Sequence, residues 1–169
     1  MRRAASAVAS ANTDAGRSGS ERWTRMTPSI SPKSRSVRSP EVELAVVGAH
    51  LSDQPLNPQL LSLGAHFDRT TTTAPGYRLH ALSTTPPKPG LVHIGEGGAA
   101  IEAEVWRLPA EGLGRLLAAL PRPMALGGVE LADGTRVPGF LCEPGALSGA
   151  EDITAYGGWR AYLRRDPRP

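Results

Sequence analysis

A histidine follows directly on a short apolar run, in the order Leu44-Ala45-Val46-Val47-Gly48-Ala49-His50-Leu51. The run predicts a strand that ends near Gly48. His50 then lies in the loop that follows, a common place for reactive residues. Because glycine has no Cβ, the backbone can approach a ligand closely, and the successive N–H groups of Gly48, Ala49 and His50 could bind an anion. Histidine, with a pKa of about 6.5, suits proton transfer near neutral pH. The alternative interpretation is a half-buried histidine at a strand end.

Three further side chains could complete an anion site with His50. Arg78 could hold a carboxylate through two parallel N–H groups, and the hydroxyl of Tyr77 could orient the ligand. Lys88 lies in the proline-rich stretch Pro86-Pro87-Lys88-Pro89-Gly90 and could add positive charge. Each also has a structural interpretation: a core aromatic for Tyr77, an exposed strand arginine for Arg78 and a solvated loop lysine for Lys88.

Two carboxylates alternate along residues 100–108, which read as a strand. Glu102 and Glu104 fall on the same face, about 6.8 Å apart along the strand. That spacing could serve paired acid–base chemistry, and the alternative is an exposed strand face.

Other reactive residue types favour no site. His66, His80 and His93 lack the spacing of zinc ligands, so we expect no metal and no cofactor. The glycine-rich turn 95–98 lacks the Gly-Lys-Ser/Thr ending of a phosphate loop and predicts a hairpin. Cys142 is the single cysteine, so it has no internal disulfide partner, and it reads as a buried residue at a strand end.

Positive charge is concentrated at the N-terminus. The chain of 169 residues has a formal net charge of +3, yet its first 40 residues contain eight Lys or Arg against two acidic residues. The basic character therefore belongs to that segment and does not indicate nucleic-acid binding. Residues 1–40, rich in Ser, Arg and Ala, have no apolar period and predict a disordered tail. They resemble an organelle transit peptide, or sequence translated from too early a start codon. Residues 165–169 predict a disordered end.

The ordered domain should span residues 41–164. Strands are expected at 42–47, 70–73, 77–82, 91–94, 100–108, 129–131 and 137–142. A short helix should begin with Asn57 as its N-cap and stop at Gly64, and a second should cover 110–120. Asp133-Gly134 predicts a hairpin, and 152–163 a strap over the core. This order indicates an α+β fold, a mixed or antiparallel sheet curled into a small barrel with flanking helices. No apolar stretch approaches the roughly 18 residues of a membrane span, so we expect a cytoplasmic protein.

Six segments, in order along the chain, resemble the C-terminal domain of allophanate hydrolase: residues 46–51, 55–57, 73–79, 87–92, 101–106 and 151–163. More widely, the pattern resembles the γ-glutamylcyclotransferase-like fold, which has a pocket at its glycine turn. The resemblance implies His50 and Glu104 as catalytic residues. It implies substrate-binding roles for Gly48, Ala49, Leu51, Asn57, Tyr77, Arg78, Lys88 and Gly90.

The resemblance also implies a reaction. Allophanate hydrolase has an amidase domain that converts allophanate to ammonia and N-carboxycarbamate, which the C-terminal domain decarboxylates. Since the amidase signature does not fit in residues 1–40, we expect a stand-alone domain, or a subunit of a split enzyme, that works with a separate amidase. The family's dimers also allow a homodimer. Two alternatives stay open: a non-catalytic module that binds a small anion or an amidase, and a γ-glutamylcyclotransferase-like enzyme. Against the last, the superfamily's catalytic glutamate beyond the helix is replaced here by Leu120-Pro121-Arg122-Pro123.

Overall fold

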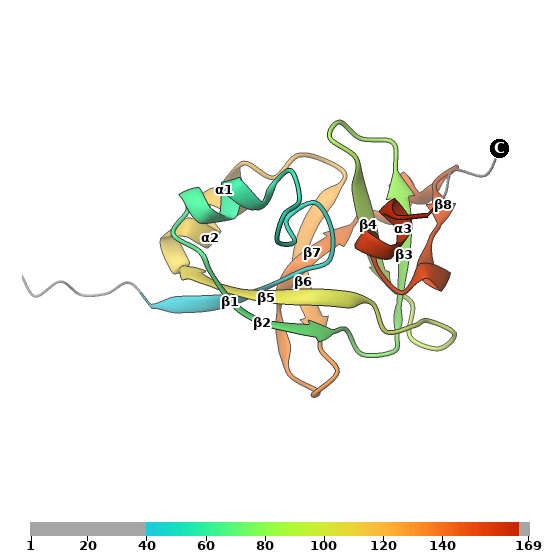
Figure 1. Ribbon diagram of the computed structural model, residues 1–169, viewed down its shortest axis with the longest axis horizontal. Helices are drawn as coiled ribbons and strands as arrows, with labels where there is room; N and C mark the ends of the chain where they lie inside the picture. Colours follow the sequence, from blue (N-terminus) through green and yellow to red (C-terminus); the bar gives the residue numbers. More distant parts are fainter. Residues whose placement is uncertain (1–39, 166–169) are drawn as a thin grey trace, which may run out of the picture. The chain divides into compact units, whose positions relative to one another are not determined.

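The computed structural model describes residues 40–165 as two β-sheets with short helices (Figure 1). The predictions for residues 1–39 and 166–169 lie outside this range. The strands are β1 (Glu41–Val46), β2 (His66–Thr72), β3 (Tyr77–Leu82), β4 (Lys88–His93), β5 (Glu102–Pro109), β6 (Met124–Glu130), β7 (Arg136–Cys142) and β8 (Glu151–Asp152). The helices are α1 (Asn57–Ser62), α2 (Ala110–Ala118) and α3 (Trp159–Leu163), with 3₁₀ turns η1 (Pro144–Leu147) and η2 (Thr154–Tyr156).

The larger sheet has the strand order β2-β5-β1-β7-β6. Strand β1 pairs antiparallel with β5, placing Leu44 opposite Trp106, and parallel with β7, placing Ala45 opposite Gly139. The second half of β1 is covered on both faces, and a strand so covered reads as a continuous apolar run. This is why Leu44, Ala45 and Val46 follow one another and are each at most 1% exposed.

The smaller sheet has the order β4-β3-β8 and lies against β7. A Cβ built on Gly90 of β4 would lie 2.9 Å from the Sγ of Cys142 on β7, so the approach requires glycine at this point. Within residues 40–165 the strands therefore form two packed sheets, and the barrel expected from the sequence is not closed.

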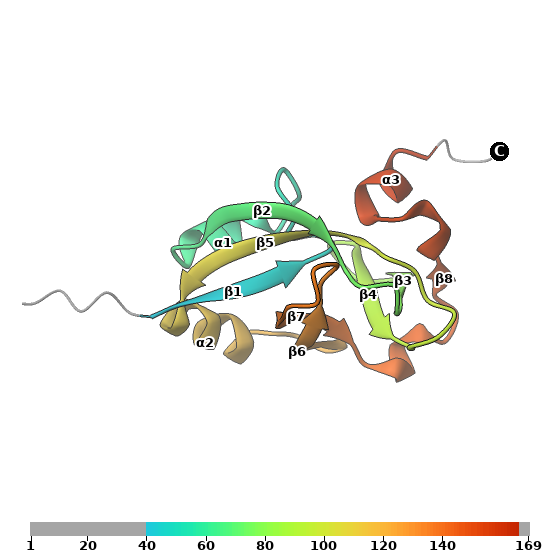
Figure 2. The same cartoon turned by 90° about the horizontal axis from the view of Figure 1, so that it is seen from below.

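The two longer helices lie at the same end of the large sheet (Figures 1 and 2). Helix α2 begins at Ala110 as predicted, and Leu116 is buried whereas the neighbouring Leu117 is exposed. Helix α1 differs from its prediction: Asn57 lies inside the first turn and does not cap it, because its side chain donates to the carbonyl oxygen of His50.

The C-terminal segment closes one side of the core, as predicted. Ile153, Trp159 and Tyr162 are buried within it, and the ring of Trp159 stacks on that of Tyr162. In the part of the chain that the structure describes, no helix has the length and apolar character needed to cross a membrane.

Candidate functional site

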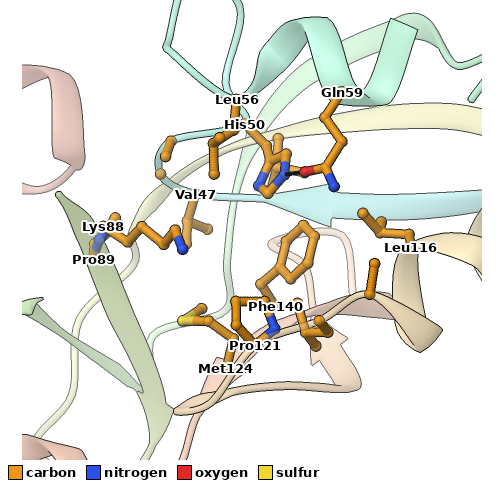
Figure 3. Close-up of a pocket in the computed structure, with 15 residues that line it drawn as sticks. Val47, His50, Leu56, Gln59, Lys88, Pro89, Leu116, Pro121, Met124 and Phe140 are labelled. Carbon is orange, nitrogen blue, oxygen red and sulfur yellow. Dashed lines mark hydrogen bonds between the residues drawn. The ribbon is translucent and has the colours of Figure 1, made fainter. Parts of the chain in front are cut away.

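A pocket of about 230 Å³ opens beside the loop that follows β1 (Figure 3). Its walls come from that loop, helices α1 and α2, strand β4, and the ends of β6 and β7. They are formed by Val46, Val47, Gly48, Ala49, His50, Leu56, Gln59, Lys88, Pro89, Leu116, Ala119, Leu120, Pro121, Met124 and Phe140.

The loop 48–51 is a tight turn, closed by a hydrogen bond of 2.9 Å from the N–H of Leu51 to the carbonyl oxygen of Gly48. A Cβ at Gly48 would lie 2.3 Å from the Cγ of Pro89, so the contact between this turn and β4 requires glycine. Among residues 40–165, no acceptor pairs with the N–H groups of Gly48, Ala49 and His50. Backbone donors at buried positions are normally paired, and these three unpaired groups belong to residues that line the pocket.

The imidazole of His50 is fixed on two sides. It stacks on the ring of Phe140, with centroids 4.6 Å apart, and its Nε2 lies 2.9 Å from the Oε1 of Gln59. Because this amide oxygen can only accept, Nε2 carries the proton, and Nδ1 makes no hydrogen bond to the described residues. Burial lowers the pKa of His50, the hydrogen bond to Gln59 opposes this, and the positive charge of Lys88 lowers it further.

Lys88 brings positive charge to the pocket. Its side chain extends from β4 toward the pocket, on the side where His50 lies (Figure 3). No Asp or Glu is found among the described residues that line the pocket, so the charge of Lys88 is not neutralised there. The unpaired N–H groups and this ammonium favour an anionic ligand.

Gly48, Ala49, His50 and Lys88 are thus brought together, whereas other predicted binding residues lie elsewhere. The hydroxyl of Tyr77 accepts a hydrogen bond of 2.8 Å from the N–H of Glu130 and so belongs to the core. Arg78 points away from the core and lies 3.6 Å from a carboxylate oxygen of Asp152.

Leu51, Asn57 and Gly90 support the site without lining it. Leu51 is fully buried, and the side chain of Asn57 holds the carbonyl group of His50 at 3.0 Å. Gly90 is used for the contact between the two sheets.

Glu104, predicted as catalytic, is buried below the pocket loop in an ion-pair network. Its Oε2 accepts hydrogen bonds from the N–H of Ser52 at 2.8 Å and from Trp106 Nε1 at 3.1 Å, and its Oε1 lies 2.5 Å from Arg160. Arg160 also donates to Glu102 at 2.9 Å. The two glutamates therefore share an arginine, and neither lines the pocket. Burial by itself raises the pKa of Glu104, but its hydrogen bonds from Arg160, Ser52 and Trp106 together lower it, which keeps the carboxylate ionised.

The sequence did not reveal Gln59, Phe140 or the apolar wall formed by α2 and β6. Gln59 lies two residues after Asn57 in α1, and the predicted helix could have suggested that its amide faces the loop. For Phe140 no local signal exists, because its contact with His50 spans most of the domain. Residues 40–165 contain no group of three or more His, Cys, Asp or Glu arranged to hold a metal ion.

Comparison with known structures first defines the fold. An aig2-like protein from Mus musculus superposes with a TM-score of 0.53 at 19% identity, over 76% of this chain and 97% of that chain. A protein of Pyrococcus horikoshii gives a TM-score of 0.55 at 21% identity, over 72% and 92% of the two chains. These matches confirm the predicted α+β fold class.

The family follows from nearer relatives. Residues 42–164 match the allophanate hydrolase C-terminal domain, and the chain belongs to that family. It is 42% identical to urea amidolyase of Saccharomyces cerevisiae over 130 residues, which are 74% of this chain and 7% of the relative. The chain thus spans about 7% of the length of the urea amidolyases that it matches.

Two solved structures agree closely. Allophanate hydrolase of Kluyveromyces lactis has a TM-score of 0.71 and 39% identity, covering 73% of this chain and 21% of that chain. A protein specific to uropathogenic E. coli has a TM-score of 0.70 and 34% identity, covering 75% of this chain and 98% of that chain.

Proposed function

We propose that this protein decarboxylates N-carboxycarbamate, or a similar carboxylated urea derivative, in the degradation of urea. Its substrate is formed by a separate amidase acting on allophanate. The observation that carries the proposal is that one pocket is lined by His50, by Lys88 and by a turn, Gly48–His50, whose three backbone N–H groups have no partner among the described residues. Membership of the allophanate hydrolase C-terminal domain family supports the choice of substrate.

Binding depends on the positive side of the pocket. The ammonium group of Lys88 and the N–H groups of Gly48, Ala49 and His50 bind a carboxylate of the substrate. In the reaction, the bond between nitrogen and the departing carboxylate carbon breaks and its electron pair stays on nitrogen. A proton must reach that nitrogen, and the products are carbon dioxide and carbamate.

His50 supplies this proton from Nδ1. When the imidazole is protonated, Nε2–H stays on Gln59 and Nδ1–H is left for the substrate. Burial lowers the resting pKa of His50, and the charge of Lys88 lowers it further. A bound anion offsets the charge of Lys88 and raises the pKa of His50, so the proton is taken up when substrate binds. The imidazole regains its proton from water after each turnover.

A second function, as a non-catalytic module that binds a small anion, rests on one observation. Glu104 is committed to Arg160, Ser52 and Trp106, and no carboxylic acid is found among the described residues that line the pocket. The same pocket would bind the anion in either case, and carbon dioxide release separates the two functions.

The test combines the purified chain, a separately purified amidase and allophanate, and follows carbon dioxide release. We expect release to be faster than with the amidase alone. His50→Ala should remove the acceleration, while His66→Ala, on the exposed edge strand β2, should retain it. If the complete chain gives no acceleration, decarboxylation is excluded. Binding of malonate, in which CH₂ replaces the NH of N-carboxycarbamate, would then support the non-catalytic module.

A further inference from the structure

The pocket that contains His50 has two chemically different walls. Lys88, His50 and Gln59 form the polar side. The wall that lies below His50 in Figure 3 is apolar and adjoins the histidine, because Phe140 is stacked on the imidazole. It is formed by α2, the segment after it, and the facing strands, through Leu116, Leu120, Pro121, Met124 and Phe140.

The pocket volume exceeds the size of the small dianion. The cavity measures about 230 Å³. On this measure of cavity volume one water needs about 10–15 Å³, so a compact anion with the bulk of three or four waters needs roughly 50 Å³. When its carboxylate lies at Lys88, more than half of the pocket remains to be filled, and that part borders the apolar wall.

The distribution of charge in the pocket also favours a ligand with an apolar part. Lys88 is the formally charged side chain among the described lining residues, and burial favours the neutral form of His50. Positive charge in the described lining is therefore confined to the Lys88 side of the pocket. Any part of a ligand that reaches Leu120 and Met124 loses its hydration without gaining a polar partner, so that part must be uncharged and apolar.

We infer that the pocket takes a small carboxylate bearing an apolar substituent of about three to five carbon atoms. The carboxylate lies at Lys88 and the Gly48–His50 turn, and the substituent lies against Leu120, Met124 and Phe140. N-alkylated carbamates and N-alkylated carboxylated ureas belong to this class. The inference rests on the pocket of the proposed function, but not on decarboxylation.

The experiment is calorimetric titration of the complete chain with malonate, ethylmalonate and butylmalonate, which share one head group. Burial of each CH₂ contributes about 0.8 kcal/mol, which corresponds to about fourfold in affinity. We expect ethylmalonate to bind about fifteenfold more tightly than malonate, and butylmalonate more tightly again. Equal affinities, or weaker binding of butylmalonate, would overturn the inference while leaving the proposed substrate in place. No binding of any of the three would overturn both.

A variant pair locates the substituent. Met124→Gln keeps the length of the side chain and puts an amide on the apolar wall. It should remove most of the preference for butylmalonate over malonate. Leu117→Gln is the control, because Leu117 is 55% exposed and lies outside this pocket. Equal losses for both ligands in Met124→Gln, with an unchanged thermal melt, would contradict the assigned wall.

Discussion

The imidazole of His50 lies nearly parallel to the ring of Phe140, with centroids 4.6 Å apart and 9° between the planes. His50 follows β1 and Phe140 belongs to β7, and these strands run parallel with Ala45 opposite Gly139. The pairing of two distant segments therefore supplies the surface on which the histidine rests. With Gln59 holding Nε2, the stack fixes the plane of the ring before any ligand enters.

Removal of the Phe140 ring should destabilise the protein, and it also removes the ring on which the imidazole of His50 is stacked. Phe140 is 6% exposed, so Phe140→Ala should lower the free energy of unfolding by about 3 kcal/mol or more. Phe67→Ala is the matched control, because Phe67 is 48% exposed, and its cost should stay below about 1 kcal/mol. Urea unfolding measures both, and equal costs would show that Phe140 is not a core residue.

The lowered pKa of His50 makes stability depend on pH. Burial favours its neutral form in the folded state, whereas the unfolded chain takes up the proton near pH 6.5. The unfolded state therefore binds more protons between the lowered pKa and 6.5, and stability falls as the pH drops through this window. His50→Gln should flatten the dependence of the melting temperature between about pH 5 and 7. A wild-type curve parallel to that of the variant would contradict a lowered pKa.

Local sequence patterns predicted most of the strands and helices, because the burial of residues near in sequence and the turn-forming residues between them determine where these elements lie. The apolar run of β1, the Asp133-Gly134 hairpin and the start of α2 could be predicted because each depends on neighbours in sequence. The role of Glu104 could not, because alternation with Glu102 suggests a polar face and its partner Arg160 lies in the last helix. The closed barrel expected from the sequence does not form, and this too could not be predicted locally, because tertiary packing determines whether two sheets close into a barrel.

Two residues predicted to bind the carboxylate, Lys88 and Arg78, lie in different places in the structure. Both were candidates for the carboxylate, but Lys88 lines the pocket and Arg78 faces Asp152. Lys88→Met should weaken malonate binding at least tenfold, about 1.4 kcal/mol, and Arg78→Met should leave it within twofold. Wild-type affinity should also rise as the pH falls toward 6, because the bound anion raises the pKa of His50. Calorimetry in buffers of different ionisation enthalpy measures this proton uptake. A larger loss in Arg78→Met would place the anion on β3 instead.

The carboxylate of Glu104 should act on the pocket through Ser52. Glu104→Gln keeps the size of the side chain but leaves Arg160 without its buried counter-charge and offers a donor to Ser52. We expect a loss of about 3 kcal/mol in the free energy of unfolding. Glu111→Gln should cost less than about 0.5 kcal/mol, because its pair with Arg115 is exposed.

The pH dependence gives an independent check on Glu104. Its pKa is lowered in the folded state, so its contribution is present above the usual value of about 4.5 and is lost as the pH falls through the lowered one. The difference in free energy of unfolding between wild type and Glu104→Gln should therefore shrink as the pH falls through the lowered pKa of Glu104. Ser52 lies two residues after His50, so malonate should also bind more weakly to folded Glu104→Gln. Unchanged malonate affinity would show that the network stabilises the fold without positioning the His50 loop.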